Sequence, residues 1–163
     1  MQKLKVYVAG PLGFSESGRH WMKERLLPKL SGAGVEILNP FRDIMGMGTE
    51  PPVKSAKATG KDEAMAMGER NIDDIRSADA VLAVLDGADV DSGTAAEIGY
   101  AFGLGKPVVG YRGDFRISGD SVSVVVNLQV QVFVEKSGGR IFHSLDEAIG
   151  ALTSISSAIS KSI

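Results

Sequence analysis

Six consecutive apolar residues, Ala80-Val-Leu-Ala-Val-Leu85, constrain the fold of this chain more than any other segment. An apolar run of strand length, without polar alternation, predicts a strand that is buried on both faces of a parallel sheet. Residues 94–104 follow with helical character and end at Gly105, which suits the position after a helix. The chain therefore contains a strand-to-helix unit of the kind that builds parallel sheets.

The rest of the chain repeats this alternation. Strands are predicted over residues 4–9, 35–38, 80–85, 106–111 and 140–143, and helices over 15–30, 61–77, 94–104 and from 144 onward. Pro28 predicts a kink or an early stop in the first of these helices. Met65, Ile72 and Ile75 are spaced to share one side of the second. Residues 42–62 predict a long irregular loop, and 128–135 is ambiguous between strand and helix.

Composition limits the possible functions. The chain has 163 residues, no cysteine, 44% hydrophobic and 23% charged residues, and a formal net charge of −2. This length predicts one domain over residues 1–163, with a Ser-rich end that frays over about 153–163. The absence of cysteine excludes disulfides, thiol nucleophiles and thiolate metal sites, and the charge gives no basic patch for nucleic acid. Without a signal segment or an apolar run long enough to span a membrane, we expect a cytoplasmic protein with a small-molecule substrate.

Two carboxylates lie where parallel sheets bind ligands. Asp91 and Glu97 follow the 80–85 strand, and the crevice at the carboxyl ends of strands is the usual ligand site of such folds. We expect Glu97 in the first turn of the helix, where the helix dipole favours its ionised form. The alternative is that Thr94-Ala-Ala-Glu97 is a capping box, in which Glu97 only satisfies a backbone N–H. Asp91 has a similar alternative as a helix cap.

The segment from Asn71 to Val108, with its central run Asp91-Ser-Gly-Thr-Ala-Ala-Glu97-Ile-Gly-Tyr, resembles the nucleoside 2-deoxyribosyltransferase family. Val6-Tyr-Val-Ala-Gly-Pro11 and Asn127-Leu128 fall where that family has equivalent signals, so the similarity extends from Lys5 to about Leu152. The resemblance implies a flavodoxin-like, Rossmann-like three-layer sandwich with a five-stranded parallel sheet. It also implies a helix that starts near Asn127, and an enzyme that needs neither cofactor nor metal.

The resemblance also implies roles for individual residues. Glu97 matches the family's carboxylate nucleophile, and Asp91 matches an aspartate that takes part in proton transfer to the nucleobase. Tyr7 matches a tyrosine that hydrogen-bonds the nucleophile, although a strand tyrosine also packs well in a core. Gly10 and Pro11 end the first strand in a loop that can admit a sugar closely. With Gly93, they are expected to bind substrate.

Two asparagines complete the expected site. Asn127 matches an asparagine that reaches the active site of a neighbouring subunit, which implies a homo-oligomer with shared sites. Its alternative is a helix cap. Asn71 stands where several family members have an aspartate that touches the base, and an amide cannot act as an acid. Asp73 and Asp74, close behind, are expected to be solvated helix residues.

The resemblance implies transfer of 2-deoxyribose between nucleobases, through a covalent glycosyl-enzyme intermediate on Glu97. Deoxynucleosides and nucleobases are then the partners, and neither nucleic acid nor membrane is. Two alternatives stay open. A hydrolase that cleaves the N-glycosidic bond of 2′-deoxynucleoside 5′-monophosphates shares the fold and nucleophile, and Ser15, Ser17 and Arg19 could serve its phosphate. A non-catalytic nucleotide-sensing module has no need of Glu97.

Overall fold

The computed structural model describes residues 3–46 and 60–160, and only the backbone of 156–160. In these residues five strands form one sheet, in the order β2-β1-β3-β4-β5. They are β1 (Lys5–Ala9), β2 (Glu36–Leu38), β3 (Ala80–Val84), β4 (Val108–Tyr111) and β5 (Ile141–Phe142). Every neighbouring pair is parallel. This is the flavodoxin-like strand order, so the predicted fold class is confirmed.

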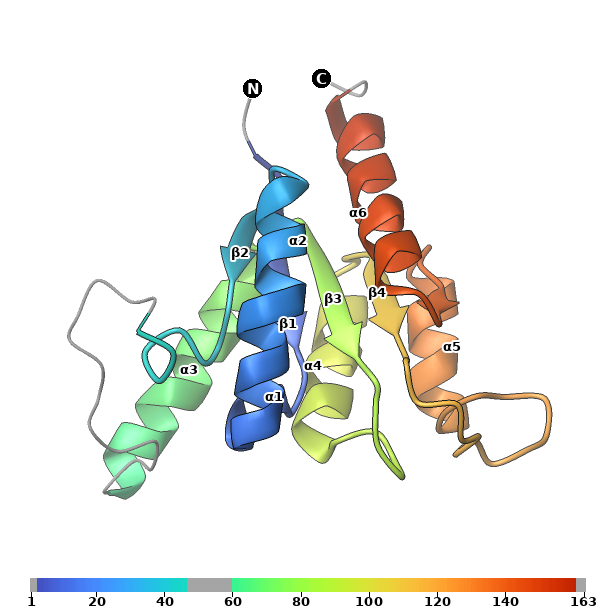
Figure 1. Ribbon diagram of the computed structural model, residues 1–163, viewed down its shortest axis with the longest axis horizontal. Coiled ribbons are helices and arrows are strands. Elements are labelled where there is room, and N and C mark those ends of the chain that lie inside the picture. Colours follow the sequence, from blue (N-terminus) through green and yellow to red (C-terminus); the bar gives the residue numbers. More distant parts are fainter. Residues whose placement is uncertain (1–2, 47–59, 161–163) are drawn as a thin grey trace.

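Helices cover both faces of the sheet and make three layers (Figure 1). One face is covered by α1 (Glu16–Trp21), the π-helical turn η2 (Met22–Leu26), α2 (Leu27–Gly32) and α6 (Leu145–Ser160). The other is covered by α3 (Lys61–Ser77), α4 (Ser92–Gly103) and α5 (Leu128–Lys136). A short 3₁₀ turn, η1 (Leu12–Phe14), follows β1. The helix predicted near Asn127 is therefore present as α5.

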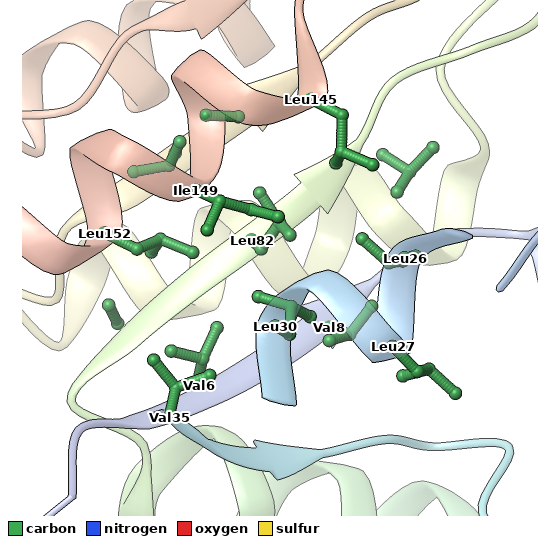
Figure 2. Packing of buried hydrophobic residues seen from close by; sticks show 14 of the residues in the cluster. Val6, Val8, Leu26, Leu27, Leu30, Val35, Leu82, Leu145, Ile149 and Leu152 are labelled. Atoms are coloured by element: carbon green, nitrogen blue, oxygen red, sulfur yellow. The ribbon is translucent and has the colours of Figure 1, made fainter. Parts of the chain in front are cut away.

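Alternate side chains of the strands enter two separate cores. Figure 2 shows Val6, Val8 and Leu82 facing Leu30 of α2 and Ile149 of α6. On the opposite face, side chains from β1 and β3 pack against α4 and α5; the buried members include Tyr7, Val81, Ile98 and Val130. All five residues of β3 are buried, as its unbroken apolar sequence predicts.

The first helix passes through Pro28 instead of stopping there. The backbone N–H of Leu27 bonds to the carbonyl of Met22, five residues back, so the helix is widened by one residue before the proline. A proline ring clashes with the carbonyl four residues earlier in a regular α-helix. The wider turn accommodates the ring by changing this register, and helix continues to Gly32.

The remaining differences concern the ends of elements and one helix face. The predicted helix 61–77 is confirmed as α3, but Met65 and Ile72 on its expected inner side are 57% and 40% exposed. The first turns of α3 extend past the sheet (Figure 1), so only Ile75, near its end, reaches the core.

α6 runs to Ser160, and fraying of the chain end stays a prediction. Residues 47–59 of the predicted 42–62 loop lie outside the described residues. No helix in the described ranges has the length and apolarity to cross a membrane.

Candidate active site

Tyr7 and Glu97 meet beside the carboxyl ends of the central strands. Tyr7 lies in the middle of β1 on the face that α4 covers, and its side chain is fully buried. Its hydroxyl donates a hydrogen bond to Glu97 Oε1 at 2.6 Å. The two residues are 90 positions apart in sequence, so only the packing of α4 against the sheet brings them together.

Asp91 begins the helix that carries Glu97. Its Oδ2 accepts hydrogen bonds from the backbone N–H of Thr94 at 2.9 Å and from the Thr94 hydroxyl at 3.1 Å. Asp91 is therefore the N-cap of α4, which is the alternative that the sequence left open for it. Because the helix starts at Ser92, two residues before the predicted start, Glu97 lies in the second turn and not in the first.

The capping-box interpretation of Thr94 and Glu97 is wrong. In a capping box the Thr side chain caps the helix and the Glu side chain bonds back to the cap residue. Here Asp91 is the cap, and Glu97 accepts a hydrogen bond from Tyr7 of the sheet. Glu97 therefore faces the sheet, and its position is not explained by the start of the helix.

Burial changes the acidity of both partners. Burial raises the pKa of Glu97 from its ordinary 4.5 to about 7, the Tyr7 hydrogen bond opposes this rise, and the nearby Asp91 carboxylate adds to it. The pKa of Tyr7 is raised far above its ordinary value, first by burial and then by the charge of Glu97. Tyr7 therefore remains a hydrogen-bond donor at any physiological pH, and Glu97 exchanges its proton near neutrality.

Replacing Tyr7 by Phe should raise the pKa of Glu97 above 7, because it removes the bond that stabilises the carboxylate. A hydrogen bond to a charged group contributes about 1.5–3 kcal/mol, so we expect a rise of roughly one to two pH units. The titration can be followed by the carboxyl ¹³C resonance of Glu97. Tyr111→Phe is the matched control, since Tyr111 lies on the other face of the sheet, stacked on Trp21. An unchanged titration in Tyr7→Phe would contradict the assigned role of the bond.

An ion pair that the sequence did not predict lies beside Tyr7. Arg42, after β2, pairs with Asp74 of α3, and the exposed fractions of the two side chains are only 26% and 15%. The charge of Asp74 raises the pKa of Tyr7 and that of Arg42 lowers it, so both lie near the site. The expectation of a solvated residue is wrong for Asp74. It holds for Asp73, whose side chain is 74% exposed and pairs with Arg76.

Asn71 lies on the same side of α3 as Asp74, because residues three apart on a helix share a face. It is partly buried. Residues 71, 74 and 78 follow helical spacing, and this spacing could have placed Asp74 on the same face of the helix as Asn71. Asn71 and Asp74 therefore share one face of α3, and Asp74 is the member of this face that lies near Tyr7.

The loop after β1 is shaped by close packing. Gly10 has a φ of 156°, and a Cβ there would lie 3.0 Å from Cβ of Val84 at the end of β3. A Cβ on Gly13 would lie 2.0 Å from the ring of Phe41. The Pro11 carbonyl accepts the N–H of Phe14 at 3.1 Å and closes the η1 turn. The glycines allow this loop to lie against the central strands, beside the Tyr7 strand.

Gly93 and Asn127 are both at the starts of helices. Gly93 is exposed in the first turn of α4, and a Cβ on it would lie 3.1 Å from Asp91 Oδ2. Asn127 is the N-cap of α5, with Oδ1 accepting the N–H groups of Gln129 and Val130 at 3.0 and 3.4 Å. Tyr7, Asp91 and Glu97 are thus brought together, whereas Asn127 bonds to its own helix. Within the described ranges no group of three or more His, Asp or Glu could hold a metal.

Known proteins resemble this chain in sequence pattern and in fold. The family model for nucleoside 2-deoxyribosyltransferase matches residues 6–136. A conserved protein from Enterococcus faecalis V583 is 25% identical with a TM-score of 0.69, over 94% of this chain and 99% of that chain. A 2-deoxyribosyltransferase from Leishmania mexicana is 26% identical with a TM-score of 0.65, over 93% and 97%. A CMP N-glycosidase from Clostridium botulinum, 18% identical with a TM-score of 0.54 over 91% and 97%, shares the fold. No curated protein matches significantly.

Proposed function

The chain belongs to the nucleoside 2-deoxyribosyltransferase family, and from this premise we propose that it transfers 2-deoxyribose from one nucleobase to another. The observation that carries the proposal is the half-buried Glu97 carboxylate, held by Tyr7 and lying close to a second carboxylate, Asp91. A nucleophile that is oriented by one group and accompanied by a proton carrier is what exchange at an anomeric carbon requires. The substrates are deoxynucleosides and free nucleobases, without cofactor or metal.

Each half of the proposed reaction is one displacement. Ionised Glu97 attacks C1′ of the sugar, the bond from C1′ to the base nitrogen breaks, and that nitrogen takes a proton from solvent, relayed by Asp91. The product is a glycosyl ester of Glu97 and a neutral base. A second base then attacks C1′ and returns its proton to solvent through Asp91, and the carboxylate of Glu97 is released. Two inversions return the sugar to its original configuration.

Four further residues are proposed to bind substrate in this scheme. Gly10 and Pro11 bring backbone close to the sugar, and Gly93 does so at the start of α4. Asn71 supplies an amide that can both donate to and accept from a base. Its position on the Asp74 face of α3 supports this role. Because the amide is not an acid, the proton transfer is assigned to Asp91.

The second candidate function is hydrolysis of the N-glycosidic bond of a deoxynucleoside monophosphate. The shared fold of the Clostridium botulinum CMP N-glycosidase favours it. Two of the three residues that could serve a phosphate have structural roles here, whereas Ser17 is exposed. Ser15 Oγ caps α1 by accepting the N–H of Gly18 at 2.9 Å, and Arg19 donates to the carbonyl of Gly13 at 2.9 Å. We therefore rank it below transfer, and we rank a nucleotide-sensing module lowest, since sensing does not need the Tyr7–Glu97 pair.

One assay separates these functions. The protein is incubated with deoxyinosine and adenine, and separately with deoxycytidine and deoxyguanosine monophosphates, and the products are identified by chromatography. Deoxyadenosine and hypoxanthine would support transfer. Free base and deoxyribose 5-phosphate would instead support the hydrolase, and binding without any product would support the sensing module.

The rate of transfer should rise with pH through about 7. Glu97 must be ionised to attack, and its pKa is raised to about 7, so below this value most of the free enzyme is protonated and inactive. The acid limb of kcat/KM reports groups of the free enzyme and should therefore have an apparent pKa near 7. Measuring kcat/KM for deoxyinosine from pH 5 to 9 tests this. An acid limb near the ordinary glutamate value of 4.5 would contradict it.

A further inference from the structure

Arg112 is a fully buried arginine at the carboxyl end of the strands, the end of the sheet where the proposed site lies. It directly follows β4, and its side chain is 0% exposed. Its guanidinium donates to the carbonyl oxygens of Leu85, of Gly87 at 3.1 Å and of Arg116 at 2.7 Å. Removing a cation from water costs free energy unless the cation is well hydrogen-bonded, and these carbonyl oxygens supply hydrogen bonds to the buried guanidinium.

Asp86 makes a complementary bond between the same two loops. It lies between Leu85 and Gly87, and its Oδ1 accepts the backbone N–H of Asp114 at 2.8 Å. Residues 85–87, which follow β3, are therefore fixed by residues 112 and 114, which follow β4. We call this set of bonds from Arg112 and Asp86 the Arg112 clamp.

The sheet does not need the clamp for its own pairing. β3 and β4 are already joined along their length by parallel pairing, and the N–H of Leu85 bonds to the carbonyl of Tyr111 at 2.8 Å. The clamp instead acts on the residues that come after the two strands end. It fixes the first residues of the segment 85–91, which finishes at Asp91, the cap of the helix that carries Glu97.

We propose that Arg112 is a positioning residue, which acts through residues 85–91 to hold Asp91 against Glu97. Its effect on turnover rests on the proposed function, but its effect on the two carboxyl groups does not. Glu97 faces Tyr7 of β1 and Asp91 of α4, while Asp74 of α3 and Arg42 after β2 act on Tyr7. Of these groups, only Asp91 is carried by the clamped segment.

The test uses Arg112→Met and Arg112→Lys in the full chain, with Arg116→Met as the matched control. Arg116 contributes only its backbone carbonyl to the clamp, which the substitution keeps, and its side chain is exposed and pairs with Asp114. Arg112→Met should lower kcat for transfer roughly 10- to 100-fold, because small misplacements of reacting groups have effects of this size. KM should change by less than about threefold. Arg112→Lys should recover part of kcat, and Arg116→Met should behave as wild type.

The ¹³C titration of Glu97 is a second measurement that needs no turnover. The negative charge of Asp91 raises the pKa of Glu97, so a displaced Asp91 should let this pKa fall in Arg112→Met. If Arg112→Met does not fold, Asp86→Ala, which breaks the other half of the clamp, should give the same shift, and Asp86→Asn, which keeps the accepting oxygen, should not.

A folded Arg112→Met, or Asp86→Ala in its place, with wild-type kcat and an unchanged Glu97 titration would overturn the proposal. A shift of equal size in Arg116→Met would also overturn it, since the effect would then belong to the loop as a whole. If the wild type turns over no substrate, the proposed function fails, and the titration alone decides whether Arg112 positions the carboxyl pair.

Discussion

Replacing Glu97 by Gln should lower deoxyribose transfer by roughly 10³-fold or more, the size of effect seen when a covalent nucleophile is removed. The amide cannot form the glycosyl ester, although its oxygen can still accept the hydrogen bond from Tyr7. Transfer from deoxyinosine to adenine measures the loss. Glu135→Gln is the control, because Glu135 is exposed on α5, where it accepts from Gln131 at 2.8 Å, and should keep wild-type activity.

The same substitution should not weaken the fold at alkaline pH. The pKa of Glu97 is about 7 in the folded protein and 4.5 ordinarily, so between these values the folded state holds a proton that the unfolded chain has released. Wild-type stability therefore falls as pH rises through this window. Gln carries no charge, so the Tm of Glu97→Gln relative to wild type should increase from pH 4.5 to 7 and then level off. A variant that melts far below wild type at pH 8 would indicate a structural role.

Trapping the intermediate identifies the nucleophile directly. A 2-fluoro-2-deoxyribosyl nucleoside should leave a sugar adduct on the wild type, detectable by intact-protein mass spectrometry, and none on Glu97→Gln. Fragmentation should locate the adduct on the peptide that contains Glu97. An adduct on any other residue would remove Glu97 from the role of nucleophile, even if the substitution abolished activity.

The sheet was predictable because its strands are distinctive in sequence. The apolar run 80–85 requires burial on both faces, and β3 is buried throughout. The path of the first helix was harder to predict, because Pro28 is compatible with a kink, a stop or the widened π turn that the structure shows before it. The face of α3 was also misjudged: its spacing is amphipathic, but its first turns extend beyond the sheet that would cover them.

In the site, sequence spacing identified residues but not their partners. The segment around Glu97 was singled out, yet spacing alone left open a bond within the helix, and the partner of Glu97 is in a strand 90 residues away. The pair of Arg42 with Asp74 and the bonds of Arg112 likewise join segments that only the fold brings together. A buried arginine that bonds to backbone carbonyls leaves no complementary residue in the sequence, so no motif could have indicated it.

Substituting Asn127 should weaken substrate binding and raise the ratio of hydrolysis to transfer, because we propose that this residue closes the active site of a neighbouring subunit. Water must be excluded from a glycosyl intermediate if the sugar is to be transferred. Surface around Asn127 supports a partner there: Val122 is 95% exposed, and Leu128 and Val132 on α5 are 51% and 37% exposed. The capping bonds use the side-chain oxygen, so the amide nitrogen is the atom we assign to a sugar hydroxyl.

Asn127→Asp is the sharper variant, since aspartate keeps the cap of α5 and loses the amide donor, whereas Asn127→Ala loses both. Co-expression of Asn127→Asp with Glu97→Gln, each carrying a different tag, should restore transfer in purified hybrids. In a hybrid dimer one of the two sites has Glu97 from one chain and Asn127 from the other. Activity of the isolated single variants sets the baseline. Hybrids of confirmed composition that recover nothing, or a wild type fully active as a monomer in sedimentation, would show that each site is built within one chain.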